Sequence, residues 1–258
     1  MKITIRRETD KSSDKASDTS GSSAGTADTG DVSAADASSG LASGDGADAA
    51  DADLPFIDTP ACVEGEVYDA GITCEQAMEL VKKYNEDEFH HTHAQTVSDL
   101  MRYYAKKYDP QNEEFWAVVG MLHDLDWEKW QDEHLHTVKT TELLQEAGVD
   151  MHVAHAIQTH NSDYNARLPK PSHKMEKVLW ACDETSGLIG ATIAMYPSKS
   201  AAELNLKSLK KKYKNKKFAA GCDRENIARG AELNGMEVEE LLAELITATK
   251  EISGVPAE

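Results

Sequence analysis

Apolar residues recur at helical spacing along most of the chain from Ile72 onward. Between residues 86 and 107, for example, Val97, Leu100, Met101 and Tyr104 have the i, i+3, i+4, i+7 spacing of one helix face. Similar patterns predict further helices at about 72–85, 113–125, 134–147, 150–160, 173–196, 200–212, 223–234 and 236–252. Because no strand-like alternation of useful length occurs, the sequence predicts an all-α fold, a single irregular helical bundle.

Residues that start and stop helices support these boundaries. Thr73 and Gln76 have the spacing of a capping box at a helix start. Pro110 lies where one predicted helix ends and the next begins, because proline suits a first helical turn. Gly148 and Gly235 are placed as helix C-caps.

The first sixty residues lack this helical pattern. They consist mainly of Ala, Ser, Asp, Gly and Thr, with about twelve acidic and about five basic side chains. Ordering one residue costs roughly 1–2 kcal/mol of backbone entropy, whereas burying a large aliphatic side chain contributes about 1.5–3 kcal/mol. With almost no such side chains, residues 1–60 are predicted to form a disordered acidic tail. Residues 61–258 are predicted to fold as one domain.

The composition narrows the range of functions. The chain has 27 basic and 46 acidic residues and a formal net charge of −19, which disfavours nonspecific binding to nucleic acid or anionic lipid. No run reaches the ~20 apolar residues of a membrane span, and no apolar region of an export signal follows the N-terminus. The four cysteines are widely separated and indicate reduced thiols. We therefore expect a cytoplasmic protein without a nucleic-acid or membrane partner; the sequence does not indicate its oligomeric state.

All ten histidines lie between positions 90 and 173. Helical periodicity turns both His90 and His93 toward the core and does not choose between them. His136 and His160 also fall on apolar faces, although a lone inward histidine is more often a hydrogen-bonded core residue than a metal ligand. The other histidines of the cluster, apart from His123, are expected to be mostly solvated: His91, His134, His152, His155 and His173.

Two acidic positions stand out beside these histidines. The dipeptide His123-Asp124 ends the most apolar predicted helix, and Asp183 lies within the apolar stretch KVLWACDETSGLIGA. A buried carboxylate is costly unless it has a partner, which would be a metal ion, an arginine or a helix N-terminus. Taken alone, the His-Asp dipeptide is weak support for a metal, and Asp183 has the alternative of a helix cap or an ion pair.

The candidate residues occur in the order His93, His123-Asp124, His136, His160 and Asp183. This order resembles the HD superfamily of metal-dependent phosphohydrolases, whose pattern is H…HD…D with two additional histidines in members that bind two metals. The similar segments are HAQTVSDLMRYYAKKY, GMLHDLDW, AIQTHN, ACDETSGLI and KSLKKKYKNKKFAAGCDRENI. They are most similar to a branch of predicted HD hydrolases of unknown substrate and extend from about Glu75 to the C-terminus.

The resemblance implies a helical bundle of the HD-domain type with a metal site. It favours His93 over His90 as the first ligand. It implies a first divalent metal held by His93, His123, Asp124 and Asp183.

A second metal would be held by His136 and His160, with Asp124 as the bridging ligand. In members with one metal these two histidine positions serve substrate or proton transfer instead, and His134 is an alternative to His136. One or two divalent ions are therefore expected. Mixed imidazole and carboxylate ligands favour Mn, Fe, Co or Ni over Mg.

The implied chemistry is attack on phosphorus by a metal-activated water. We place Asp124, His136 and His160 in the catalytic group. Asp126 joins them as a carboxylate expected to orient a ligand imidazole, with the alternative that it only ends a helix.

The lysine-rich stretch LKSLKKKYKNKKF stands out in an acidic chain. It is either a solvated helix face or a rim that attracts phosphate. In the second case Lys207, Lys211 and Arg224 would bind the substrate.

Three functions agree with these residues. The leading hypothesis is a metal-dependent phosphohydrolase that cleaves a small phosphoester, for example a nucleotide. The alternatives are a di-iron oxygenase built on the same six ligands and a non-catalytic module stabilised by metal. The sequence does not identify the substrate, because fold-level analogy supports only a reaction class.

Overall fold

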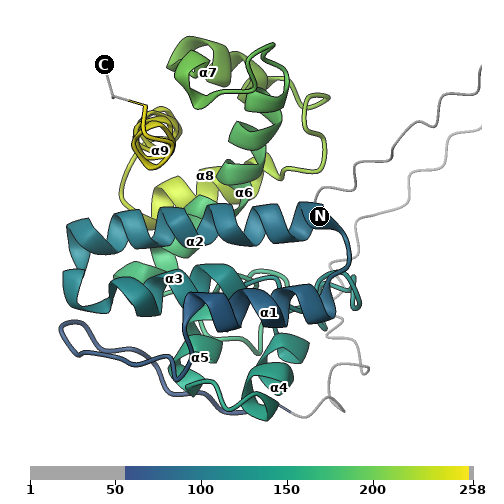
Figure 1. Ribbon diagram of the computed structural model, residues 1–258, viewed down its shortest axis with the longest axis vertical. Helices are drawn as coiled ribbons and strands as arrows, with labels where there is room; N and C mark the ends of the chain where they lie inside the picture. Colours follow the sequence, from purple (N-terminus) through teal and green to yellow (C-terminus); the bar gives the residue numbers. More distant parts are fainter. Residues whose placement is uncertain (1–55, 256–258) are drawn as a thin grey trace, which may run out of the picture. The chain divides into compact units, whose positions relative to one another are not determined.

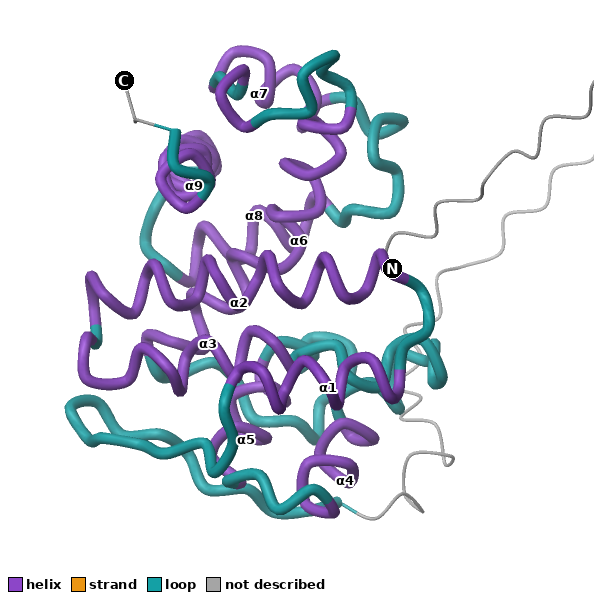
Figure 2. The backbone as a smooth tube through the Cα atoms, in the orientation of Figure 1, coloured by secondary structure: helices purple, strands orange, loops and turns teal. Residues whose placement is uncertain are grey.

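The computed structural model describes residues 56–255. In that part of the chain all regular structure is helical, as Figure 2 shows, and the predicted all-α class is confirmed. The α-helices, labelled in Figure 1, are α1 (Cys74–Tyr84), α2 (Glu88–Tyr108), α3 (Glu113–Leu122), α4 (Val138–Glu146), α5 (Met151–Thr159), α6 (Lys174–Ala194), α7 (Leu206–Lys214), α8 (Arg224–Leu233) and α9 (Val238–Ile252).

Helix α2 is central to the packing of the helices. It contacts α1, α3, α6 and α9. In Figure 1, α1 and α3 lie on one side of α2, and α6, α8 and α9 lie on the other. Helices α4 and α5 pack on each other, and α5 also contacts α3 and α6. The ends of α3 and α5 are thereby brought close to the middle of α6.

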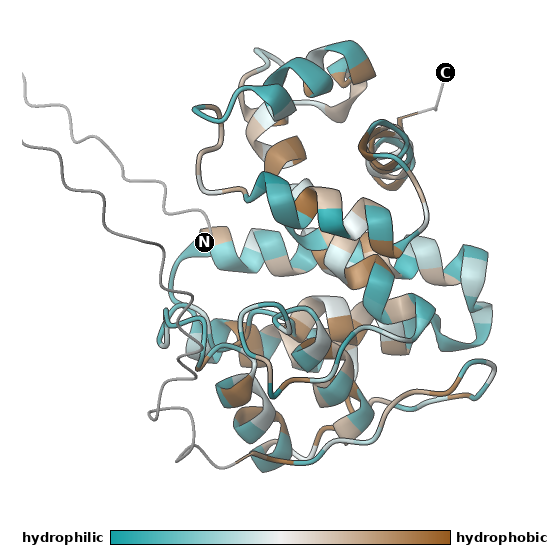
Figure 3. Ribbon diagram, turned by 180° about the vertical axis from the view of Figure 1, so that it is seen from behind, coloured by the Kyte–Doolittle hydropathy of each residue, from teal (hydrophilic) through white to brown (hydrophobic). Residues whose placement is uncertain are grey.

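Large apolar side chains fill the space between these helices. Phe115, Trp116, Met121 and Leu122 of α3, the most apolar of the predicted helices, are each 2% exposed or less. Burial of each side chain of this kind contributes about 1.5–3 kcal/mol. Figure 3 shows that the helices carry both hydrophobic and hydrophilic residues, as expected of helices with one buried face.

Gly120 allows α3 to approach the backbone of α2. A Cβ atom at this position would lie 2.9 Å from the carbonyl oxygen of Val97. Across the same contact, the Ser98 hydroxyl donates to the carbonyl oxygen of Ala117 at 2.8 Å. The close approach sets the end of α3 beside the part of α2 that carries His93.

Most helix boundaries agree with the predictions. Helix α2, predicted at 86–107, spans Glu88–Tyr108, and α9, predicted at 236–252, spans Val238–Ile252. Thr73 and Gln76 form the predicted capping box. Gly148 and Gly235 have positive φ angles of 73° and 69°, as C-cap glycines do.

Three predicted boundaries were wrong. The helix predicted at 113–125 ends at Leu122, and the helix predicted at 134–147 begins only at Val138. Between them the chain forms turns, and Thr137 has a left-handed backbone (φ 67°) that cannot continue a right-handed helix. The helix predicted at 200–212 is a 3₁₀ turn at 201–203 followed by α7. The apolar periodicity did not reveal these turns, because their buried residues follow one another at spacings that also suit a helix.

Two other expectations concern the N-terminal region and the thiols. The predicted tail, residues 1–60, lies outside the described residues except for 56–60, where the buried Thr59 donates its hydroxyl to Oε1 of Gln158 at 2.8 Å. All four cysteines are free thiols, as predicted. Within residues 56–255, none of the helices combines the length and the apolar character needed to cross a membrane.

Candidate metal centre

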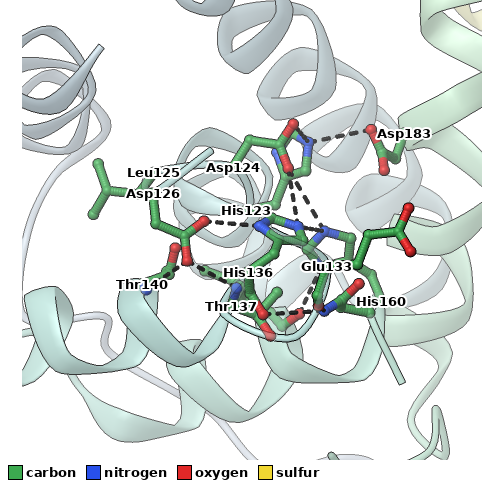
Figure 4. Close-up of polar contacts among 12 residues, drawn as sticks. His123, Asp124, Leu125, Asp126, Glu133, His136, Thr137, Thr140, His160 and Asp183 are labelled. Carbon is green, nitrogen blue, oxygen red and sulfur yellow. Dashed lines mark hydrogen bonds and ion pairs between the residues drawn. The ribbon is translucent and has the colours of Figure 1, made fainter. Parts of the chain in front are cut away.

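The six predicted metal ligands converge in the structure. They come from separate elements: α2 supplies His93, the end of α3 and its following turn supply His123 and Asp124, the turn before α4 supplies His136, the end of α5 supplies His160, and α6 supplies Asp183. Figure 4 shows His123, Asp124, His136, His160 and Asp183 pointing toward one another. His136 therefore reaches the cluster from a turn, not from the helix face that periodicity predicted.

His93, His123, Asp124 and Asp183 form the first group of possible metal donors. Nε2 of His93 lies 3.1 Å from Nε2 of His123 and 3.1 Å from Oδ1 of Asp183. Oδ2 of Asp124 lies 3.5 Å from Nε2 of His123 and 3.7 Å from Nε2 of His93. One nitrogen or oxygen of each side chain therefore faces a common centre.

Asp124, His136 and His160 form the second group. Nε2 of His136 lies 3.1 Å from Nε2 of His160. Oδ1 of Asp124 lies 3.5 Å from Nε2 of His136 and 3.7 Å from Nε2 of His160. Asp124 thus offers one oxygen to each group, Oδ2 to the first and Oδ1 to the second.

Backbone carbonyls and one carboxylate determine the tautomer of three of these rings. Nδ1 of His123 donates to the carbonyl oxygen of Gly120 at 2.8 Å, and Nδ1 of His160 donates to that of Ile157 at 2.5 Å. A carbonyl oxygen only accepts, so Nδ1 carries the proton and Nε2 of the neutral ring presents a lone pair. Nδ1 of His136 donates in the same way to a carboxylate, described next.

Asp126 is fully buried and holds the turn that carries His136. Its Oδ1 accepts from Nδ1 of His136 at 2.7 Å, and its Oδ2 accepts the backbone N–H groups of Thr137 and Thr140 at 2.8 Å and 2.9 Å. Figure 4 shows these three contacts. Asp126 therefore has the geometry expected of a carboxylate that orients a ligand imidazole.

The facing lone pairs fit a cation in each group. Two nitrogens that each lie about 2.1 Å from one ion, at angles of 90–110°, are about 3.0–3.4 Å apart. The Nε2–Nε2 separation is 3.1 Å in both groups. In the second group both rings carry the proton on Nδ1, so two Nε2 lone pairs face each other and repel unless a positive charge lies between them. Imidazole and carboxylate donors without thiolate suit Mn, Fe, Co or Ni. The residues present therefore fit one or two divalent ions.

Two adjoining openings lead to the two donor groups. The opening at the first group is lined by His93 and Asp124 together with Phe89, His90 and Gly187. The opening at the second group is lined by His136 and His160 together with Glu133, Asn161, Tyr164 and Asn226. Both openings include Trp127, Asp183 and Glu184. Burial lowers the pKa of His90 at the first opening, and the nearby Asp124 and Glu128 carboxylates act in the opposite direction.

The three predicted substrate-binding cations line neither opening. Lys207 and Lys211 are exposed on α7. The Arg224 guanidinium donates to four backbone carbonyls, those of Tyr213, Phe218, Ala219 and Cys222. The structure therefore assigns Arg224 to holding the loop between α7 and α8, and it brings none of the three to the metal ligands.

Several histidines outside the cluster depart from the prediction that they are solvated. His155 and His173 are buried, at 8% and 4% exposure, because segment 56–64 and the start of α6 cover them. His91 is half-buried, with Nε2 at 2.8 Å from the carbonyl oxygen of Asn85. His134 is exposed, as predicted, and is not a member of either donor group.

Sequence reasoning missed the residues that form the walls of the two openings. Trp127, Glu133 and Tyr164 lie in turns whose course no periodicity indicates. Glu184 had a visible signal, because it follows the predicted ligand Asp183 directly and lies in an apolar helix. Its Oε2 accepts the backbone N–H of Asp223 at 3.1 Å, which joins α6 to the start of α8 at the site.

Comparison with known proteins gives one finding. The family model described as HD domain matches residues 91–188, a range that contains all six candidate ligands. No curated protein and no solved structure matched the chain. The match and the convergence of the H…HD…D residues on one cluster lead to the same assignment: residues 91–188 of this chain are an HD domain.

Proposed function

We propose that this chain is a metal-dependent phosphohydrolase that cleaves a small phosphoester with a metal-activated water. The observation that carries the proposal is the pair of donor groups joined by Asp124. Divalent ions bound there would lower the pKa of a coordinated water toward neutrality and offset the charge of the phosphoryl oxygens. A small phosphorylated metabolite of the cytoplasm, not nucleic acid or a membrane, is the proposed partner.

The residues of the chain have distinct roles in this proposal. Asp124 ties the two groups together, because each of its oxygens belongs to one of them. Asp126 keeps the Nδ1 proton of His136 in a hydrogen bond, so Nε2 of that ring remains an acceptor and His136 acts as a ligand, not a proton donor. His123 is fully buried, which excludes bulk water from the inner side of the site.

A di-iron oxygenase is the second candidate. Four imidazoles and two carboxylates in two linked groups also suit iron, and iron sites of this composition can activate dioxygen instead of water. A metal-stabilised module without catalysis is the third candidate.

The test is metal analysis combined with an activity panel. The protein is stripped with a chelator, reloaded anaerobically with Mn, Fe(II), Co or Ni, and assayed for phosphate release from phosphorylated metabolites and an aryl phosphate. Asp124→Asn serves as the matched control, because it keeps the side-chain shape but removes the charge shared by both groups. We expect metal-dependent phosphate release by the native chain and none above background by the variant.

The three candidates predict different results. Oxygen uptake by the iron-loaded protein with no phosphate release under any metal would favour the oxygenase. Stoichiometric metal with neither activity would favour the non-catalytic module. Full metal content in Asp124→Asn would contradict the site itself.

A further inference from the structure

The side chains that line the two openings include several carboxylates, whereas a site that binds a polyphosphate needs positively charged side chains. Glu133 and Glu184 add two carboxylates to those of Asp124 and Asp183. Among the described residues that line the openings there is no lysine or arginine. Four carboxylates therefore line the openings, and their negative charge disfavours a second phosphate or a carboxylate beside the metal donors.

Aromatic rings lie beside these carboxylates. Trp127 lines both openings and is half-buried, with its ring 5.1 Å from that of His136 in an edge contact. Tyr164 lines the second opening. An aromatic face next to a carboxylate attracts a cation through both the ring quadrupole and the charge. The combination fits an ammonium group better than it fits an anion.

Hydrogen bonds fix two of the side chains that line the second opening, Tyr164 and Glu184. The Tyr164 hydroxyl lies 3.3 Å from Oδ2 of Asp223, to which it donates, and it accepts from Nδ2 of Asn226 at 3.1 Å. The backbone N–H of the same Asp223 donates to Oε2 of Glu184. Burial and the Asp223 charge raise the pKa of Tyr164 to about 12, so the ring stays a neutral phenol at physiological pH. Tyr164 and Glu184 are therefore held in place before a ligand binds, which favours selection of a ligand by charge.

We propose that the substrate is a phosphomonoester of an amino alcohol, and that Glu133 and Glu184 select its ammonium group. The phosphoryl group lies at the metal donors, and the ammonium end lies against the Glu133, Glu184 and Trp127 wall. This inference rests on the proposed phosphohydrolase function. Glu133 is drawn beside the ligand cluster in Figure 4.

The test uses three two-carbon phosphomonoesters that differ only at the far end: phosphoethanolamine, 2-hydroxyethyl phosphate and phosphoglycolate. With the metal-loaded full chain we expect kcat/KM for the ammonium ester to exceed that for the carboxylate ester about tenfold or more, since each factor of ten corresponds to about 1.4 kcal/mol. The hydroxyl ester is expected to fall between them. Glu133→Gln and Glu184→Gln should each reduce the ammonium preference about threefold or more, and the double variant should nearly remove it.

A matched control and a second readout keep the outcomes separate. Glu146→Gln makes the same charge change at an exposed position on α4 and should leave the preference unchanged. Calorimetric binding of the corresponding amino-, hydroxy- and carboxyalkyl phosphonates should give the same order without catalysis.

Preference for the carboxylate or hydroxyl compound, or an ammonium preference that survives in the double variant, would overturn the inference. Hydrolysis of none of the esters, together with no phosphate release from the wider panel of phosphorylated metabolites and the aryl phosphate, would overturn the phosphohydrolase function, and the phosphonate binding order would still decide the selectivity.

Discussion

The chain contains two buried clusters of histidine and carboxylate that differ in how the ring nitrogens are used. The first, which we call the metal cluster, consists of the six candidate ligands, and in each donor group two Nε2 atoms face each other at 3.1 Å. The second, which we call the Glu176 cluster, contains His155, His173 and Glu176. There the rings face backbone groups and carboxylates, and no grouping of donors suited to a metal is found among these residues.

Most polar atoms of the Glu176 cluster are hydrogen-bonded within the protein, but Oε1 of Glu176 is buried without a hydrogen-bond partner among the described residues and lies 3.9 Å from Nε2 of His155. Nδ1 of His155 lies 2.9 Å from the carbonyl oxygen of Thr59, and Nδ1 of His173 accepts the backbone N–H of Met175 at 3.2 Å. Oε2 of Glu176 accepts the N–H groups of Ser172 and His173 at 2.7 Å and 2.8 Å. These contacts cap α6 and attach segment 56–64. Burial of histidine with carboxylate is thus common to both clusters, and convergence of Nε2 lone pairs is what separates a metal site from a structural one.

The largest effect that would test this comparison is on metal content. His123→Ala should abolish metal binding by the first group, because it removes a donor from that group and the facing partner of His93. His155→Ala should keep the full metal content, because the ring only supports segment 56–64. Metal per folded protein is measured by mass spectrometry, with circular dichroism as the check on folding. Equal metal content in the two variants would remove the distinction between the clusters.

A smaller effect on metal binding is expected from a change at Asp126. This carboxylate accepts a hydrogen bond from the candidate ligand His136, and it also accepts backbone N–H groups, as a structural carboxylate does. Asp126→Asn should weaken binding of the second ion about 10–100-fold, as loss of a carboxylate partner of a ligand imidazole does. The first group should bind as before, because none of its donors contacts Asp126 in the hydrogen bonds described. Competitive titration with a metal chelator separates the two sites. A uniform loss of both ions would mean that Asp126 supports the whole fold of residues 123–140.

The fold could be predicted largely from the sequence, because the helical period of apolar residues is a local property. The turns at 123–137 could not, because they bury residues at spacings that also suit a helix, and because Thr137 adopts a left-handed backbone without being glycine. His136 is a member of the second donor group, but it reaches that group from a turn and not from the helix face that periodicity predicted.

The ligand set could be predicted only with the resemblance to a family. Periodicity did not separate His90 from His93, and the two differ in the structure by one observation: only His93 has Nε2 within 3.1 Å of Asp183 and His123. The walls at Glu133, Tyr164 and Asn226 are brought together from distant turns and from α8, so no spacing indicates them. The four carbonyls that bind Arg224 are equally invisible to sequence, since backbone carbonyls belong to every residue type.

The next effect is on stability, and it tests the structural role of the Glu176 cluster. Glu176→Ala should lower the free energy of unfolding by about 2–3 kcal/mol, because the buried N–H group of His173 and the N–H group of Ser172 lose their acceptor at the start of α6. Glu79→Ala is the matched control, since its exposed i,i+3 pair with Lys82 contributes at most about 0.5 kcal/mol. Urea unfolding gives both values. A metal-depleted but fully stable Glu176→Ala protein would show that the roles of the two clusters are reversed.

The smallest effect is expected at the lysine-rich helix α7. The double variant Lys207→Gln/Lys211→Gln should change kcat/KM for a phosphoester less than about twofold, because both side chains are exposed and exposed charges are screened by salt. These lysines are a better test of substrate binding by α7 than Arg224 is. Loss of Arg224 would also release the four carbonyls that it binds and disturb the loop before α8. Kinetics at two ionic strengths provide the measurement. A tenfold rise in KM at both would mean that α7 contacts the substrate, and the wall of Glu133 and Glu184 could then not be the main determinant of charge selection.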